Sequence, residues 1–478
     1  MSETNKLVRE GAENIAPTEN KMGTMPMNKL LLSMALPMVI SMVIQALYNI
    51  VDSLYVAGIS ESQNEFTAIS LAFAAQNFLI AVATGTGVGI NALLSKSLGE
   101  KDTKTANKIA SNGVFLALCS YVVFLILGFT CMETYMSWMT SDPEIIEFGV
   151  QYLSICYLFS FGIFGEIVME RLMISTGRTQ LAMATQTTGA ILNIILDPIF
   201  IFTFDLGIRG AAIATVLGQM IAFGVALVLN ARFNKDIKLS FVGFKPSGRI
   251  IGRIYAIGVP SIVMASIGSV MNVMFNSILN SFGEPIGKYA QNAFGAYFKL
   301  QSFIFMPIFG LNNGIVPIVA YNYGARNRKR MLGAAKLGAL YAVSYMLLGL
   351  ILFQTIPEQL VRVFLTGADS VAVALPCVRI ISLSFIFAGF CIVIGSVFQA
   401  LGKSIFSMFV SIARQLVVLI PAAYLLSLTG DVSNVWWSFP IAEVASVIIS
   451  VIFFMVAYKK IISKIPSEPD LTAERAQD

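Results

Sequence analysis

The 478-residue chain contains no histidine. Histidine is the usual side chain that titrates near neutral pH and the commonest metal ligand, so proton chemistry here must rely on carboxylates. The five cysteines are scattered through apolar stretches and lack metal or disulfide spacings, which indicates packing roles. No nucleophile and base are found at a recognisable spacing. We therefore expect neither an enzyme nor a bound cofactor.

Charged residues are also scarce. They make up 12% of the chain, against 56% hydrophobic residues, whereas soluble domains are roughly a quarter charged. Residues 1–27 are polar and lack the apolar core and cleavage site of a secretory signal, so the first apolar stretch is expected to remain as an anchor. The composition predicts an all-α polytopic membrane protein, surrounded by lipid and without a nucleic-acid partner.

Twelve apolar stretches are long enough to cross a bilayer core as helices, which takes about 20 residues each. They lie at 28–56, 66–94, 108–132, 148–174, 179–203, 208–231, 250–280, 289–320, 332–354, 373–400, 404–428 and 434–458. We therefore expect a tail at 1–27, a first lobe at 28–231, a linker at 232–249, a second lobe at 250–458 and a tail at 459–478.

Lysine and arginine collect in alternate connections, whereas the charged residues of connections 57–65 and 133–147 are all acidic. Because cytoplasmic loops are enriched in basic residues, both termini are expected in the cytoplasm. The expected location of the multi-pass chain is a plasma membrane, taken to be a bacterial inner membrane. The basic residues are Lys96, Lys101, Lys104 and Lys108; Arg232, Lys235, Lys238, Lys245 and Arg249; and Arg326, Arg328, Lys329 and Arg330.

The two halves share a glycine pattern. Gly85, Gly89, Gly99 and Gly113 recur as Gly310, Gly314, Gly324 and Gly338, at an offset of 225 residues (310 minus 85). Six stretches per half is an even number, so both halves enter from the same side and form parallel repeats. The expected architecture is two six-helix lobes around a central cavity, which is common in transporters; a duplicated scaffold without transport is the alternative.

Polar residues follow one face of the first stretch. Gln45, Asn49 and Asp52 recur at helical spacing, and Pro37 can bend the same helix. We expect Gln45 and Asn49 to take part in substrate binding, and a packing role in hydrogen bonds between helices is the alternative for both. A carboxylate at membrane depth costs several kcal/mol, roughly 2.5 or more on insertion scales, so Asp52 is better explained by an ion or substrate pathway.

The fifth and sixth stretches add a second polar group. Asn193 and Asp197 are four residues apart, directly before Pro198, and Thr215 interrupts a face of small residues in the sixth stretch. Carboxylate, amide and carbonyl oxygens suit a hard cation or a proton. The alternatives are a helix cap for Asp197 and a packing role for Thr215.

Glu170 is a further acid within a span, although an ion pair with its neighbour Arg171 is an alternative explanation. In the second half, Asn272 and Asn276 form a neutral polar stripe that we include in a predicted substrate site. Lys299, Arg414 and Glu443 also lie within predicted spans, and the sequence assigns them no role.

The strings LNIILDPIFIF and LGIRGAAIATVLGQ, with an Asp in the first span and a glycine-rich second span, resemble the MATE (multidrug and toxic compound extrusion) family, in its DinF/MepA-like branch. The resemblance implies two six-helix lobes and a coupling site for H⁺ or Na⁺ at Asp52, Asn193, Asp197 and Thr215. It also implies drug recognition by Glu170 together with Asp197, and bending of the first helix at Pro37.

The resemblance further implies secondary active efflux of cationic, amphipathic drugs by proton- or sodium-coupled antiport, with alternating access of the two lobes in a monomer. The seventh and tenth spans lack the central acids of the NorM-like branch, which puts a cation site in the second lobe in doubt. A lipid or lipid-linked oligosaccharide flippase is the alternative function. Such a flippase is expected to line its cavity with Arg or Lys, of which few lie deep in these spans.

Overall fold

The computed structural model describes residues 20–57, 64–240 and 243–468. These residues form helices and connections, with no strand among them. After the short α2 (Lys21–Thr24), the first group of helices comprises α3 (Met27–Ala57), α4 (Asn64–Gly99), α5 (Thr103–Thr130), α6 (Met132–Met139), α7 (Pro143–Leu158), α8 (Phe161–Ser175), α9 (Thr179–Pro198), the π-helix η1 (Ile199–Thr203) and α10 (Gly207–Phe233).

The second group follows the same order. It comprises α11 (Gly248–Asn280), α12 (Ile286–Gly324), α13 (Arg328–Thr355), α14 (Pro357–Arg362), α15 (Ala368–Ser382), α16 (Phe385–Ala400), α17 (Ser404–Ile412), the π-helix η2 (Ala413–Leu419), α18 (Ile420–Ser427), α19 (Val432–Val435), α20 (Ser438–Lys460) and the 3₁₀ turn η3 (Ile462–Lys464). We call the two groups the N-lobe (α3–α10) and the C-lobe (α11–α20).

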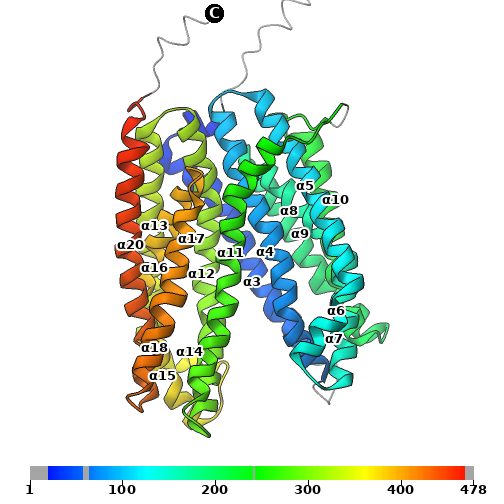
Figure 1. Cartoon of the computed structure of the whole chain (residues 1–478), viewed down its shortest axis with the longest axis vertical. Coiled ribbons are helices and arrows are strands. Elements are labelled where there is room, and N and C mark those ends of the chain that lie inside the picture. The colour runs from blue at the N-terminus through cyan, green and yellow to red at the C-terminus, as the bar shows by residue number, and fades with distance from the viewer. Residues whose placement is uncertain (1–19, 58–63, 241–242, 469–478) are drawn as a thin grey trace, which may run out of the picture.

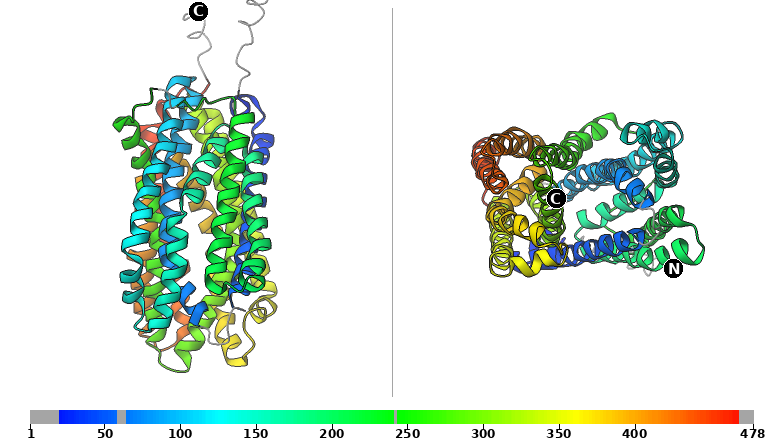
Figure 2. Two further views of the ribbon diagram at one scale, coloured as in Figure 1. Left: turned by 90° about the vertical axis from the view of Figure 1, so that its right-hand side faces the viewer. Right: turned by 90° about the horizontal axis from the view of Figure 1, so that it is seen from below.

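The lobes stand side by side (Figures 1 and 2). Their ribbons are close together at one end of the bundle and diverge toward the other (Figure 1). Residues 20 and 468 lie at the close end, together with the basic connections at 100–102, 234–240 and 325–327. We call this the basic end and the opposite end the outer end.

Ten helices in the described residues are long and apolar enough to cross a membrane, and two bent pairs bring the number to 12. The pairs are α7 with α8, bent by 46°, and α15 with α16, bent by 47°. Each pair begins and ends 225 residues from its counterpart, at Pro143 and Ala368 and at Ser175 and Ala400. The expected polytopic all-α fold with about 12 spans is therefore confirmed.

Repeat-related glycines form the contacts between the lobes. Gly89 of α4 lies against α11, where an added Cβ would be 2.3 Å from the carbonyl oxygen of Ile254. Its counterpart Gly314 of α12 lies against α3, where an added Cβ would be 2.8 Å from Cα of Ala35. Both positions therefore require glycine, because no side chain fits between the two backbones.

A second pair of glycines brings α4 and α12 together at the basic end. A Cβ on Gly99 would lie 2.0 Å from the carbonyl oxygen of Tyr321, and one on Gly324 would lie 2.1 Å from that of Lys96. The obstacle is a backbone atom in both cases, so it cannot move away by a change of rotamer as a side chain can. The two lobes are thus in backbone contact near the basic end.

The chain segment before α3 bridges the lobes at this end. Asn20 donates from Nδ2 to the carbonyl of Thr176 in the N-lobe (3.1 Å). The carbonyl of the fully buried Met22 accepts from Asn322 Nδ2 (3.1 Å) and Arg330 Nη2 (3.1 Å), both in the C-lobe. We call residues 20–25 the strap, because this segment is hydrogen-bonded to both lobes.

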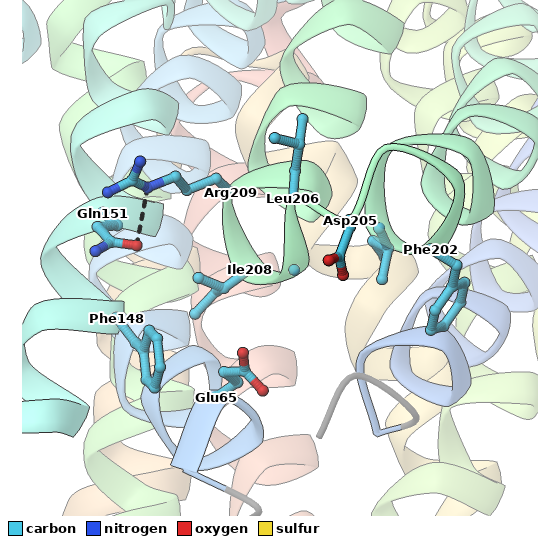
Figure 3. Close-up of a pocket in the computed structure, with 10 residues that line it drawn as sticks. Glu65, Phe148, Gln151, Phe202, Asp205, Leu206, Ile208 and Arg209 are labelled. Carbon is cyan, nitrogen blue, oxygen red and sulfur yellow. Dashed lines mark hydrogen bonds between the residues drawn. The ribbon is translucent and has the colours of Figure 1, made fainter. Parts of the chain in front are cut away.

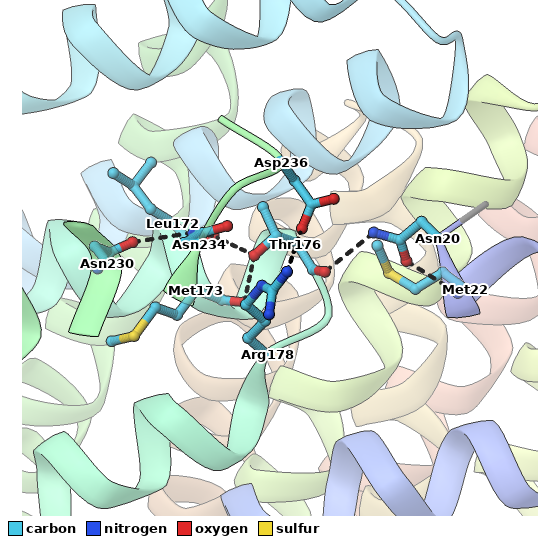
Figure 4. A network of polar contacts seen from close by, with 9 residues as sticks. All are labelled: Asn20, Met22, Leu172, Met173, Thr176, Arg178, Asn230, Asn234 and Asp236. Atoms are coloured by element: carbon cyan, nitrogen blue, oxygen red, sulfur yellow. Dashed lines mark hydrogen bonds and ion pairs between the residues drawn. The ribbon is translucent and has the colours of Figure 1, made fainter. Parts of the chain in front are cut away.

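Figure 4 shows the N-lobe side of the strap. Thr176, which accepts from the strap, lies in the turn between α8 and α9, and Arg178 in the same turn pairs with Asp236 at 3.1 Å. Burial and the nearby Arg178 charge lower the pKa of the Lys21 ammonium in the strap. The strap is therefore packed into the protein and does not lie loosely on its surface.

Replacing Arg330 by alanine is expected to release the strap. Arg330 Nη2 also donates to the carbonyl of Met25 (2.7 Å), and a lost hydrogen bond from a charged donor costs about 1.5–3 kcal/mol. Trypsin cleavage after Lys21 should then become about tenfold faster or more. Lys329→Ala is the matched control, since its exposed ion pair with Glu468 should contribute little. Equal cleavage in both variants would show that Arg330 does not hold the strap.

Candidate functional site

Two carboxyl groups predicted from sequence meet inside the N-lobe. α3 packs against α9, which brings Asp52 and Asp197 within hydrogen-bonding reach of each other. Asp197 is fully buried, and Asp52 is half-buried in the outer part of α3. A hydrogen bond between two carboxyl groups requires a proton on one of them, because two adjacent carboxylates repel each other.

The other two predicted members complete the same cluster. With its amide oriented to satisfy its neighbours, Asn193 donates to Asp197 Oδ2 at 2.6 Å and accepts from Thr215 Oγ1 at 3.3 Å. The structure adds Tyr48, whose hydroxyl is hydrogen-bonded to the Thr215 side chain and lies near both aspartates. Tyr48 precedes Asp52 by four residues, so helical spacing could have identified it.

This cluster can hold a small cation in two ways. A proton can bridge the two carboxyl groups, or their oxygens, with those of Asn193 and Thr215, can surround a hard cation such as Na⁺. The π-helix η1 begins directly after Pro198 and continues α9 beyond the cluster. Pro37, predicted to bend α3, lies inside that helix, which runs unbroken from Met27 to Ala57.

Glu170 lies in a second polar group closer to the basic end. Its carboxylate accepts from Gln186 Nε2 at 2.6 Å, and the Gln186 carbonyl oxygen accepts in turn from the hydroxyl of Ser41. Arg171 points elsewhere, since its Nη1 donates to Asn313 of the C-lobe at 2.9 Å. Glu170 and Arg171 form no direct ion pair among the described residues, although the Arg171 charge still acts on the Glu170 carboxyl group. Gln186 and Ser41 are not among the site residues predicted from the sequence.

Replacing Gln186 by leucine is expected to destabilise the N-lobe. The change leaves the Glu170 carboxylate, which is only 2% exposed, without its hydrogen-bond donor. An unsatisfied buried group costs about 1–3 kcal/mol, more when charged. Gln180→Leu on the same helix, where the side chain is exposed, should change stability by less than about 0.5 kcal/mol. Equal denaturant midpoints for the two variants would contradict the assignment.

The remaining predicted substrate residues are not in these two groups. Gln45 is half-buried and Asn49 exposed on α3. In the C-lobe, Asn276 donates to its own helix neighbour Asn272 (2.6 Å between the side chains) and accepts through its carbonyl from Gln291. Their role in substrate binding stays a prediction.

Of the unassigned residues, Lys299 lies over the ring of Phe364, 5.5 Å from its centroid, and Arg414 forms an ion pair with Glu443. An open pocket also lies at the outer end of the N-lobe, beside the start of α10, with Glu65, Asp205 and Arg209 in its wall (Figure 3). It contains none of the predicted site residues.

These features define a class: a two-lobed, multi-pass membrane protein with carboxyl groups buried among its helices. A sequence model of the MatE family matches residues 37–199 and 257–425, more than half of the chain and one segment in each lobe. The chain therefore belongs to the MatE family, which confirms the resemblance found in the sequence.

The curated relatives include the "Multidrug export protein MepA" of Staphylococcus aureus (strain MSSA476). It is 25% identical over 423 residues, which cover 87% of this chain and 91% of the relative. The protein of the same name from Staphylococcus haemolyticus (strain JCSC1435) is 25% identical over 415 residues, covering 87% and 90%. Both relatives are named as export proteins.

Solved MATE structures share the fold. One, described as the outward-facing conformation of a multidrug resistance MATE family transporter of the MOP superfamily, has a TM-score of 0.88 at 23% identity, covering 94% of this chain and 99% of that one. A MOP superfamily transporter from Pyrococcus furiosus Vc1 (DSM3638), described as having reverse polarity of the binding pocket, has a TM-score of 0.86 at 23% identity, covering 93% and 99%. At this identity the likeness concerns the fold alone.

Proposed function

We propose that the protein is a secondary active exporter of cationic, amphipathic small molecules, driven by antiport of H⁺ or Na⁺. The observation that carries this proposal is the pair of carboxyl groups of Asp52 and Asp197 inside the N-lobe. Placing carboxyl groups at membrane depth costs free energy, and such groups mark ion pathways. The MepA relatives, whose name is multidrug export protein, support export of drugs.

The lobe contacts suggest how access alternates. We place the basic end in the cytoplasm of a bacterial inner membrane, on the positive-inside rule. The backbone contacts at Gly99 and Gly324 then close the cytoplasmic side, while the coupling cluster lies in the outer part of the N-lobe. In this scheme, the cation binds at Asp52 and Asp197 and favours one arrangement of the two lobes. The drug binds near Glu170 and favours the opposite arrangement.

The membrane potential can supply the energy. One cation moving inward releases about 2.3 kcal/mol per 100 mV, which sustains a gradient of somewhat under a hundredfold for a neutral substrate at one-to-one exchange. Exchange of one monovalent cation for another moves no net charge, so the concentration gradient of the coupling ion must then drive export.

A flippase is the second candidate, and the buried arginines speak against it. Phosphate recognition requires guanidinium groups that are available to the ligand. Arg171 donates through Nη1 to Asn313, and Arg414 is paired with Glu443, so each of these arginines already has a protein partner, although the buried Nε of Arg171 has none among the described residues.

The test is efflux of a lipophilic fluorescent cation from energised bacterial cells that express the protein. Export above that of cells with empty vector supports the proposal. Efflux that persists when sodium is replaced by potassium and is then lost on adding a protonophore assigns proton drive. Loss of efflux on replacing sodium by potassium assigns sodium drive. A folded, membrane-inserted protein that exports no such dye would favour the flippase.

A further inference from the structure

The C-lobe also contains a carboxylate that is buried within a membrane span. Glu443 of α20 is 6% exposed, and its Oε2 atom has no hydrogen-bond partner among the described residues. Its other oxygen, Oε1, accepts from Nη1 of Arg414 in the π-helix η2. A carboxylate so deeply buried within a span requires a counter-charge, and the guanidinium supplies it.

The internal repeat shows which N-lobe positions correspond to this pair. At the offset of 225 residues, Arg414 corresponds to Gly189 and Glu443 to Gly218. The contact is present in both lobes, since a Cβ on Gly218 would lie 3.2 Å from the carbonyl oxygen of Gly189. The C-lobe therefore has an ion pair at the two positions where the N-lobe has two glycines in contact.

A third position completes the comparison. Cys391, which lies beside the ion pair, corresponds to Glu166 at the same offset. The Glu166 carboxylate would lie 3.7 Å from a Cβ on Gly189. Each lobe thus has one acid at these three positions. In the N-lobe the acid faces a glycine, and in the C-lobe it faces an arginine.

We propose that Arg414 is a built-in cation that permanently fills a carboxylate site of the C-lobe, so that this lobe has no exchangeable cation of its own. The titratable groups around the pair are Tyr297 of α12 and Cys391 of α16, and neither is a carboxylate that could replace Glu443. If the proposed antiport is correct, all exchange of coupling cations then takes place in the N-lobe.

The first measurement is proton uptake by the purified protein between about pH 8.5 and about pH 6. Glu443→Gln should bind as many protons as wild type, because the Arg414 guanidinium in contact with Glu443 already supplies the counter-charge of this carboxylate. Arg414→Gln should bind about one more, since a buried carboxylate without its counter-charge takes up a proton. The double variant Arg414→Gln, Glu443→Gln should return to the wild-type number.

A chemical readout supplements the proton count. Dicyclohexylcarbodiimide is a lipophilic reagent that modifies protonated carboxyl groups, and peptide mass spectrometry locates the modified residue. Glu443 should be unmodified in wild type, in Arg414→Lys and in the control Lys299→Gln, and modified in Arg414→Gln.

Two results would overturn the proposal. One is proton uptake that falls by about one in Glu443→Gln, which shows that Glu443 titrates in wild type. The other is a folded Arg414→Gln protein that binds no extra proton and is not modified at Glu443. The Glu443→Gln measurement decides the matter even if Arg414→Gln does not fold. Neither proton uptake nor carbodiimide modification depends on transport. A failure of the proposed export function would instead appear in the dye efflux measurement.

Discussion

Replacing Gly99 by alanine is expected to reduce dye efflux about tenfold. The new Cβ would collide with the carbonyl oxygen of Tyr321, and overpacking of this kind costs about 1–3 kcal/mol. The collision destabilises only the arrangement in which the lobes are in contact at the basic end. The population of this arrangement therefore falls relative to one in which the lobes are apart there. A penalty of about 1.4 kcal/mol changes the ratio tenfold. Efflux by cells expressing matched amounts of protein is the measurement.

The repeat supplies an internal check and a control. Gly324→Ala should have the same effect, because its Cβ would collide with the carbonyl oxygen of Lys96. Gly252→Ala in α11 and Gly295→Ala in α12 should leave efflux unchanged, since nothing lies within 4 Å of either added Cβ. If all four variants behave alike, backbone contact at the basic end is not needed for export.

Replacing both Asp52 and Asp197 by asparagine is expected to abolish uphill efflux. The amides keep the shape of the cluster but carry no charge, so neither a proton nor Na⁺ can be bound and released there. Coupled export should fall about a hundredfold, toward the passive leak, as expected for loss of a coupling contact of about 3 kcal/mol. Dye uptake against a gradient into everted vesicles, in which export from the cytoplasmic face appears as uptake, tests this expectation at fixed pH and sodium.

Glu133→Gln is the control for this double variant, because Glu133 is an exposed acid of α6. It removes a carboxylate of the same lobe without touching the cluster and should export at the wild-type rate. Uphill efflux that persists in the double variant would mean that coupling uses other groups, with Glu166 and Glu170 the next to examine.

The sequence predicted the large-scale features because they depend on composition and periodicity. Hydrophobic length gave the spans, and the glycine offset gave the repeat that the helix bounds at Pro143 and Ala368 reproduce. The sequence also grouped Asn193 with Asp197, since residues four apart share a helix face. Helical periodicity alone could not show that Asp52 approaches Asp197, because that contact depends on how α3 packs against α9. Only the family resemblance placed the two acids in one site.

Contacts between helices were the features that sequence reasoning missed. Gln186 is an ordinary polar residue in the printed chain, and only the packing of α9 beside α8 shows that it is the donor to Glu170. Arg171 has an acid beside it in sequence, yet its side chain extends to Asn313 in the other lobe. Adjacent residues on a helix point in different directions, so sequence neighbours are poor guides to ion pairs.

The strap has a consequence for how the protein is made. Its carbonyl at Met22 is among the first parts of the described chain to be synthesised, whereas its partner Asn322 follows 300 residues later and Arg330 follows 308 residues later. Contacts between such distant residues form late in folding. The N-lobe must therefore insert into the membrane before the strap has its hydrogen bonds to the C-lobe. These hydrogen bonds form only when both lobes have been assembled.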